Sequence, residues 1–168
     1  MGKKNKVELR ALTSDVEGEN LVIRVKIFNP EQRTLYAYGT RRRILYDNAT
    51  GKLTLCLHDQ HVQEDSAVSL HLAEPRLVQL EGNTETEISI SLPKVIKRIR
   101  SAAERGETGP STELLQVSEA EEVQLEIAYN DTPFYHNPKV DNAKQLKEWG
   151  RVIARDAFQL KPRKSTGD

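Results

Sequence analysis

The stretch Leu21-Val22-Ile23-Arg24-Val25-Lys26-Ile27-Phe28 is the strongest indicator of the fold. Its aliphatic residues recur at every second position, so an extended backbone would place them on one face. This pattern predicts a β-strand with one buried face. The strand should end at Asn29-Pro30, because proline has no amide hydrogen to donate. A second alternating run, residues 7–12, precedes it across the polar segment 14–20, and the two runs together predict a hairpin.

Further segments show the same alternation. Glu122 to Tyr129 is a second very regular alternating run, and its inward set would be Val123, Leu125, Ile127 and Tyr129. Residues 47–52 contain the Asp, Asn and Gly of a tight turn, which predicts a hairpin between 44–46 and 53–57 with Leu53, Leu55 and Leu57 on one side and Cys56 on the other. The remaining predicted strands are 35–38, 66–72, 76–80, 86–92 and 152–160, the last with Val152, Ala154, Phe158 and Leu160 inward.

Helical patterns are scarce. Residues 94–100 carry Val95 or Ile96 and Ile99 at helical spacing, which predicts one or two helical turns, and residues 141–149 predict a short capped helix. Glu104 to Thr112 has the composition of a mobile loop. Roughly eight or nine short strands with regular turns predict an all-β, antiparallel two-sheet sandwich. We expect one domain over residues 7–160, with flexible ends at 1–6 and 161–168.

The predicted arrangement is similar to the immunoglobulin and fibronectin type III architecture. The likeness rests on the opening strand, on the strand that ends in Phe28-Asn29-Pro30, and on the late pair around Tyr129 and Phe158. The chain departs from immunoglobulin domains proper, because it has one cysteine instead of a pair and its tryptophan, Trp149, lies late. The resemblance therefore implies the sandwich and no particular function, since such sandwiches have many roles.

Composition narrows the setting in which the protein works. Lys plus Arg and Asp plus Glu both number 25, so no net charge draws the whole chain to nucleic acid or anionic lipid. Cys56 is the only cysteine, which favours a reducing, cytoplasmic compartment. The apolar runs are far shorter than the ~20 residues needed to cross a bilayer, and no apolar leader follows the basic start, so we expect no membrane association.

Metal or thiol chemistry has weak support in the sequence. His58 and His61 lie three residues apart, and Glu64, Asp65 and His71 follow. A metal site competes here with a solvated loop, which we favour, because the loop leaves the geometry unspecified. Cys56 lies two residues before His58 on one strand face, but a structural thiol is the simpler interpretation. We expect no catalytic, cofactor or metal site.

Two basic clusters suggest an alternative function. Arg41, Arg42 and Arg43 form one, and Lys94, Lys97, Arg98 and Arg100 form the other. If the clusters lay together they would hold phosphates, and Tyr36 and Tyr38 would offer stacking surfaces. The competing interpretation is a solvated rim that pairs with acidic residues.

The segment Thr132 to Pro138 brackets two adjacent aromatic residues between prolines. Phe134, Tyr135 and His136 either anchor a partner or close the end of the sandwich, with Trp149 as packing neighbour. We expect a non-enzymatic module that binds another protein or assembles with itself, through an edge strand or through Arg41, Arg42, Arg43, Phe134, Tyr135 and His136. A nucleic-acid-associated accessory domain is the alternative, followed by a metal or thiol enzyme around Cys56, His58 and His61.

Overall fold

The computed structural model describes residues 6–61, 75–100, 111–135, 137–140 and 142–160. Within them the chain is mostly β, with a single α-helix. The strands form a three-stranded sheet, a six-stranded sheet and a separate two-stranded hairpin. None of the described helices is long and apolar enough to cross a membrane.

The first sheet contains β1 (Glu8–Glu17), β2 (Asn20–Phe28) and β7 (Glu85–Pro93), in the order β1-β2-β7 and wholly antiparallel. The predicted turn over 14–20 is too long, because β1 continues to Glu17 and only Gly18 and Glu19 turn the chain. Gly18 has a positive φ of 62°, which suits a two-residue turn. Arg24 of β2 pairs with Asp15 and Glu17, and these ion pairs hold the polar end of β1 in the sheet.

The six-stranded sheet contains β3 (Leu35–Tyr38), β4 (Arg43–Asp47), β5 (Lys52–Leu57), β6 (Leu77–Leu80), β10 (Glu122–Asn130) and β11 (Val152–Gln159). Its order is β4-β5-β10-β3-β6, and β11 pairs with the other side of β10. The prediction of a wholly antiparallel fold is wrong at one place, since β5 and β10 run parallel. Parallel neighbours need a long crossover, and the chain between Leu57 and Glu122 supplies one.

A hairpin replaces the helix predicted over 94–100. β8 (Val95–Arg100) pairs antiparallel with β9 (Ser111–Gln116), and the 3-10 helix η2 (Val117–Glu119) follows. A short run with three β-branched residues fits both the helical and the strand spacing of apolar residues. Pairing with β9 decides that it forms a strand. Ser111 and Thr112, expected in the mobile loop, belong to β9.

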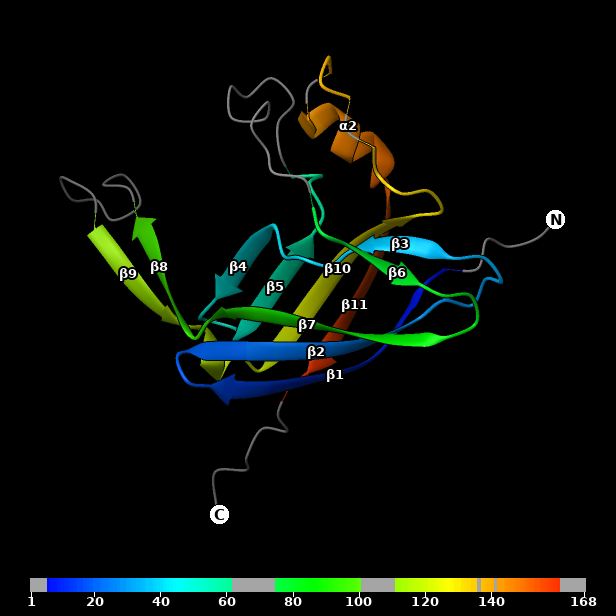
Figure 1. Ribbon diagram of the computed structural model, residues 1–168. Coiled ribbons are helices and arrows are strands. Elements are labelled where there is room, and N and C mark those ends of the chain that lie inside the picture. The colour runs from blue at the N-terminus through cyan, green and yellow to red at the C-terminus, as the bar shows by residue number, and fades with distance from the viewer. Residues whose placement is uncertain (1–5, 62–74, 101–110, 136, 141, 161–168) are drawn as a thin grey trace.

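The hydrophobic core lies between the two larger sheets, where β1, β2 and β7 cross in front of β5, β10 and β11 (Figure 1). The inward sets predicted for β2, β5 and β10 are confirmed, because all of their members are buried. In β11 Ala154 is buried as predicted, but Val152 is 48% exposed. Val152 is the first residue of β11 and pairs with Tyr129, the last but one residue of β10.

Helix α2 (Asn142–Trp149) confirms the helix predicted over 141–149. It lies at one end of the sheets (Figure 1). Trp149 packs against Tyr38, with ring centroids 5.8 Å apart, and so joins the helix to β3. Three sequence predictions lie outside the described residues: the strand over 66–72, most of the loop over 104–112, and all but Lys6 of the flexible ends.

Candidate functional site

A buried polar cluster lies on the face of the six-stranded sheet that points away from the core. Cys56 of β5 and His58, which follows it, meet Glu126 of β10, because Glu126 and Cys56 are neighbours in the parallel register. The distance from His58 Nε2 to Glu126 Oε1 is 2.9 Å, and Cys56 Sγ lies 3.9 Å from the same oxygen. Gln124 and Arg155 contact the other carboxylate oxygen at 2.6 and 3.5 Å. One thiol, one imidazole and one carboxylate within 4.8 Å of one another form the pattern of a metal site.

The hydrogen bonds of His58 argue against metal binding. The backbone N–H of Gln60 donates to His58 Nδ1 at 3.1 Å, so Nδ1 carries no hydrogen and Nε2 donates its own to Glu126. A metal-bound Nε2 needs the hydrogen on Nδ1 instead, where it would face the N–H of Gln60. Both ring nitrogens therefore serve the fold.

Cys56 also lacks the surroundings of a nucleophile. Burial, and after it the nearby charge of Glu126, raises the pKa of its thiol to about 11. Arg43 and Arg155 lower this pKa, but by less. His58 offers no free lone pair to act as a base. His61, whose ring centroid lies 5.9 Å from that of His58, has a pKa lowered first by burial and then by Arg43. Cys56, His58 and Glu126 thus form a hydrogen-bonded cluster; His71, Glu64 and Asp65 lie outside the described residues.

The three arginines predicted to bind a partner do not form one surface. Arg41 donates to the carbonyl of Ser91 at 3.1 Å, over the outer edge of β7. Arg42 has a side chain only 12% exposed and pairs at 3.0 Å with Asp59, which also accepts a hydrogen bond from Tyr38. Arg43 is exposed in β4.

The second basic cluster is only partly described. Lys94 lies 3.9 Å from Glu19, and Lys97 is exposed beside β4. The side chains of Arg98 and Arg100 are outside the described part of the chain. Tyr38, considered as a stacking surface, is fully buried.

In the loop after β10, the two adjacent aromatic residues have different surroundings. Phe134 packs edge-on against Trp149, with centroids 6.4 Å apart, and Trp149 donates to the carbonyl of Thr132 at 2.7 Å. Tyr135 is 79% exposed, and the adjoining His136 is not described. Phe134 thus closes the end of the core, while Tyr135 faces outward.

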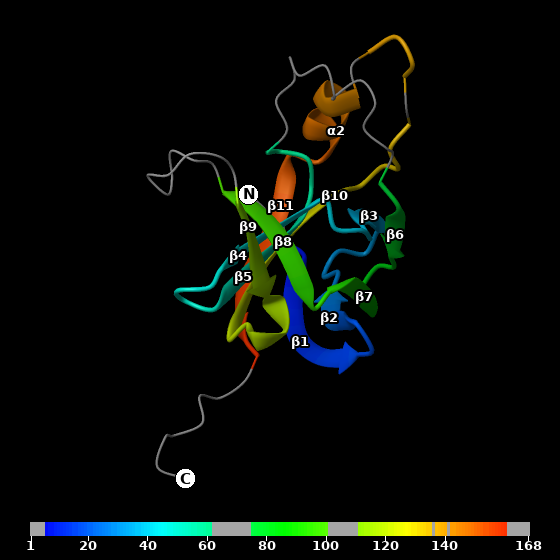
Figure 2. The ribbon, with the colours of Figure 1, turned by 90° about the vertical axis from the view of Figure 1, so that its left-hand side faces the viewer.

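The outer edge of β4 is the side of that strand that points away from β5. In the residues described, β4 pairs with β5 alone, so its other edge has no strand partner. Leu45, in the middle of β4, is 44% exposed. The β8–β9 hairpin lies on this side of the molecule (Figures 1 and 2).

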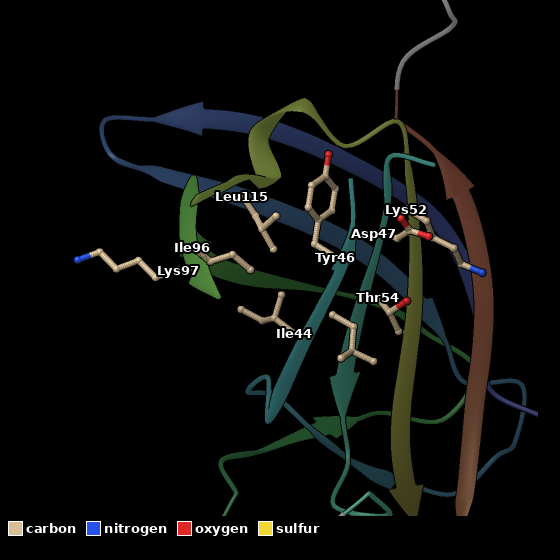
Figure 3. A pocket seen from close by; sticks show the side chains of 9 residues that line it. Ile44, Tyr46, Asp47, Lys52, Thr54, Ile96, Lys97 and Leu115 are labelled. Atoms are coloured by element: carbon tan, nitrogen blue, oxygen red, sulfur yellow. The ribbon is translucent and has the colours of Figure 1, made fainter. Parts of the chain in front are cut away.

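A cleft of about 460 Å³ is lined by residues of β4, β5 and the β8–β9 hairpin. We call it the β4 cleft; its lining residues are Ile44, Leu45, Tyr46, Asp47, Lys52, Thr54, Ile96, Lys97 and Leu115. Figure 3 shows Ile44 and Tyr46 on the side of Ile96 and Leu115. Leu45 points to the other face of the strand, as alternation requires. The lining thus includes both faces of β4: one is apolar, and on the other Leu45 lies among the polar residues Asp47, Lys52 and Thr54.

Sequence reasoning missed the β4 cleft because it did not predict β9 and treated 94–100 as helical. One signal was present, since Ile44-Leu45-Tyr46 has apolar side chains on both faces of a short strand. Compared with known protein families, with curated proteins and with solved structures, the chain shows no significant match, so the β4 cleft is interpreted from its own geometry.

Proposed function

We propose that this protein is a non-enzymatic binding domain that takes up an extended segment of protein along the outer edge of β4. The observation that carries the proposal is the β4 cleft, which combines an edge that has no strand partner in the described ranges with apolar side chains on both faces. An added strand would hydrogen-bond to the outward peptide groups of β4, while the side chains around it give specificity.

The hairpin beyond the edge supports strand addition. Ile96 of β8 and Leu115 of β9 stand opposite Ile44 and Tyr46 (Figure 3). A strand added to β4 would place alternate side chains beside these residues and remove the partly exposed apolar surface of Ile44, Tyr46 and Ile96 from water, whereas Leu115 is already buried. Exposed edges are otherwise a liability that proteins cover or charge, so an accessible edge next to an apolar cleft favours a binding role.

We propose in addition that the two sheets form a sandwich of the immunoglobulin or fibronectin III kind, in a cytoplasmic protein. The order β1-β2-β7 corresponds to strands A, B and E of that architecture, and β3-β10-β11 corresponds to C, F and G. The β4–β5 hairpin is then an insertion that extends the second sheet. The lone cysteine, Cys56, supports a reducing compartment.

Site-specific photocrosslinking tests the binding proposal. A photoreactive amino acid at Leu45 should crosslink to a bound protein in the native host, and the same group at Val16 of β1, which is 53% exposed, should not. Leu45→Lys should abolish binding to a partner found in this way. Equal crosslinking at both positions, or a partner that binds Leu45→Lys unchanged, would contradict the proposal.

A further inference from the structure

We propose that the segment bound at β4 is the β4 strand of a second copy of this chain, in antiparallel orientation, with the two Leu45 residues facing each other across a twofold axis. This inference rests on the proposed function and specifies its partner. It starts from the order of charges in β4.

The β4 sequence is complementary to its own reverse. It begins with Arg43, ends with Asp47, and has three apolar residues between them. When two such strands run antiparallel about Leu45, each Arg43 faces the Asp47 of the other copy. Ile44 of each copy faces Tyr46 of the other, and the two Leu45 residues face each other. Opposite charges and aromatic–β-branched pairs are the favourable combinations between neighbouring strands.

The backbone permits this register. Residues of a strand point their N–H and C=O groups alternately to one side and the other, so every second residue of β4 faces away from β5. With Leu45 opposite Leu45, residues of the same parity meet and the outward groups of both copies pair. A shift by one residue would oppose outward groups to inward ones. A shift by two would put Arg43 or Asp47 opposite Leu45.

The hairpin would cover the new strand pair. Ile44 and Tyr46 share the face of β4 that looks toward Ile96 and Leu115 (Figure 3), so the opposing Tyr46 and Ile44 of the second copy would lie on that face too. Each hairpin would shield one such pair from water. A twofold contact of this kind uses the same surface in both copies and closes after two subunits.

Two other strand edges, those of β7 and β6, carry no comparable pattern. The outer edge of β7 is covered in part by Arg41, which donates to the Ser91 carbonyl. β6, at the far end of the sheet, contains Leu77-Val78-Gln79-Leu80, which has no charges to set a register. Charge complementarity therefore favours β4 over these two edges.

A charge-exchange experiment tests the pairing. Arg43→Asp and Asp47→Arg each place like charges opposite each other at both ends of the strand pair, so each variant should be monomeric by analytical ultracentrifugation at concentrations where the natural chain is dimeric. An equimolar mixture of the two variants restores opposite charges at both pairs and should form a heterodimer. Lys26→Asp, exposed on β2 whose two edges are both paired, is the control and should remain dimeric.

A disulfide experiment tests the register. Leu45→Cys should form an intermolecular disulfide under mild oxidation, because directly opposed residues have Cα atoms within disulfide range. Val152→Cys, similarly exposed on β11, should not form such a disulfide, and the natural Cys56 is buried.

A monomeric natural chain, or a dimer that both charge variants leave intact, would overturn the inference. If Leu45 photocrosslinks to a different protein while the chain is monomeric, strand addition stands and only self-pairing fails.

Discussion

At the scale of single residues, Glu126 joins side chains from three segments of the sheet. Its two oxygens accept hydrogen bonds from His58 and Gln124, and Arg155 of β11 lies beside it. Its side chain is only 13% exposed, so these contacts compensate a carboxylate held largely out of water. The cluster stabilises the outer face of β5, β10 and β11.

Glu126 should make the free energy of unfolding depend on pH in the acidic range. Burial by itself raises its pKa, but the hydrogen bonds from His58 and Gln124 and the charge of Arg155 outweigh burial and lower the pKa overall. A lowered folded-state pKa adds stability above the ordinary carboxyl pKa of about 4.3, and this stability is lost as the pH falls through the folded value. In urea denaturation between about pH 3 and 7, the free energy of unfolding should fall less steeply with decreasing pH for Glu126→Gln than for the natural chain. Glu87→Gln, exposed on β7, should leave the slope unchanged; equal slopes for Glu126→Gln would refute the prediction.

Cys56 should be inert in the native protein. With a thiol pKa of about 11, the thiolate fraction at pH 7 is on the order of 10⁻⁴. Ellman's reagent should therefore react slowly with the natural chain and rapidly after urea is added. Val16→Cys provides an exposed thiol as a matched control and should react at once. Rapid native labelling of Cys56 would show that the cluster opens.

Zinc should not stabilise the protein, because the hydrogen bond from Gln60 N–H occupies His58 Nδ1 and requires the proton on Nε2. Titration with zinc or nickel should leave the melting temperature unchanged. A saturable upward shift that disappears in His58→Ala would demonstrate metal binding.

At the scale of elements, turns and loops decide where the strands begin. Gly82, in the turn before β7, passes so close to the chain after β2 that an added Cβ would contact the Gln32 carbonyl. Asn29, fully buried, holds the same region by donating to the carbonyls of Arg33 and Leu80 at 2.8 Å. The β2–β3 and β6–β7 connections are thus packed as one unit.

Gly82→Ala should destabilise the protein by about 1–3 kcal/mol, since backbone atoms must move to admit the methyl group. Gly18→Ala is the comparison, because its site is open and only the positive φ opposes alanine, at a cost of about 1 kcal/mol. Chemical denaturation measures both values. A smaller loss for Gly82→Ala than for Gly18→Ala would mean that the two connections are not closely packed.

At the scale of the whole molecule, one core connects the two larger sheets. Leu125 belongs to this core and is fully buried, whereas Leu114 of β9 is 59% exposed. Leu125→Ala should lower the free energy of unfolding by about 2–5 kcal/mol, while Leu114→Ala should change it by less than about 0.5 kcal/mol.

Both sheets should also unfold together, because they share this core. Trp149 fluorescence and far-ultraviolet circular dichroism should give the same denaturation midpoint, and Leu125→Ala should shift both equally. Separate midpoints would show that one sheet survives without the other.

The amino-acid sequence by itself determined the mostly β fold, the buried sets of β2, β5 and β10, the β4–β5 hairpin and helix α2, because side-chain alternation and turn residues act over a few neighbours. Tertiary structure decided the parallel pairing of β5 with β10, the strand identity of β8, and the meeting of Cys56 and His58 with Glu126. It also decided which edge of the sheet, beside Ile96 and Leu115, has no strand partner within the described ranges. These outcomes depend on which strands come together across long sequence separations, and no local pattern encodes that choice.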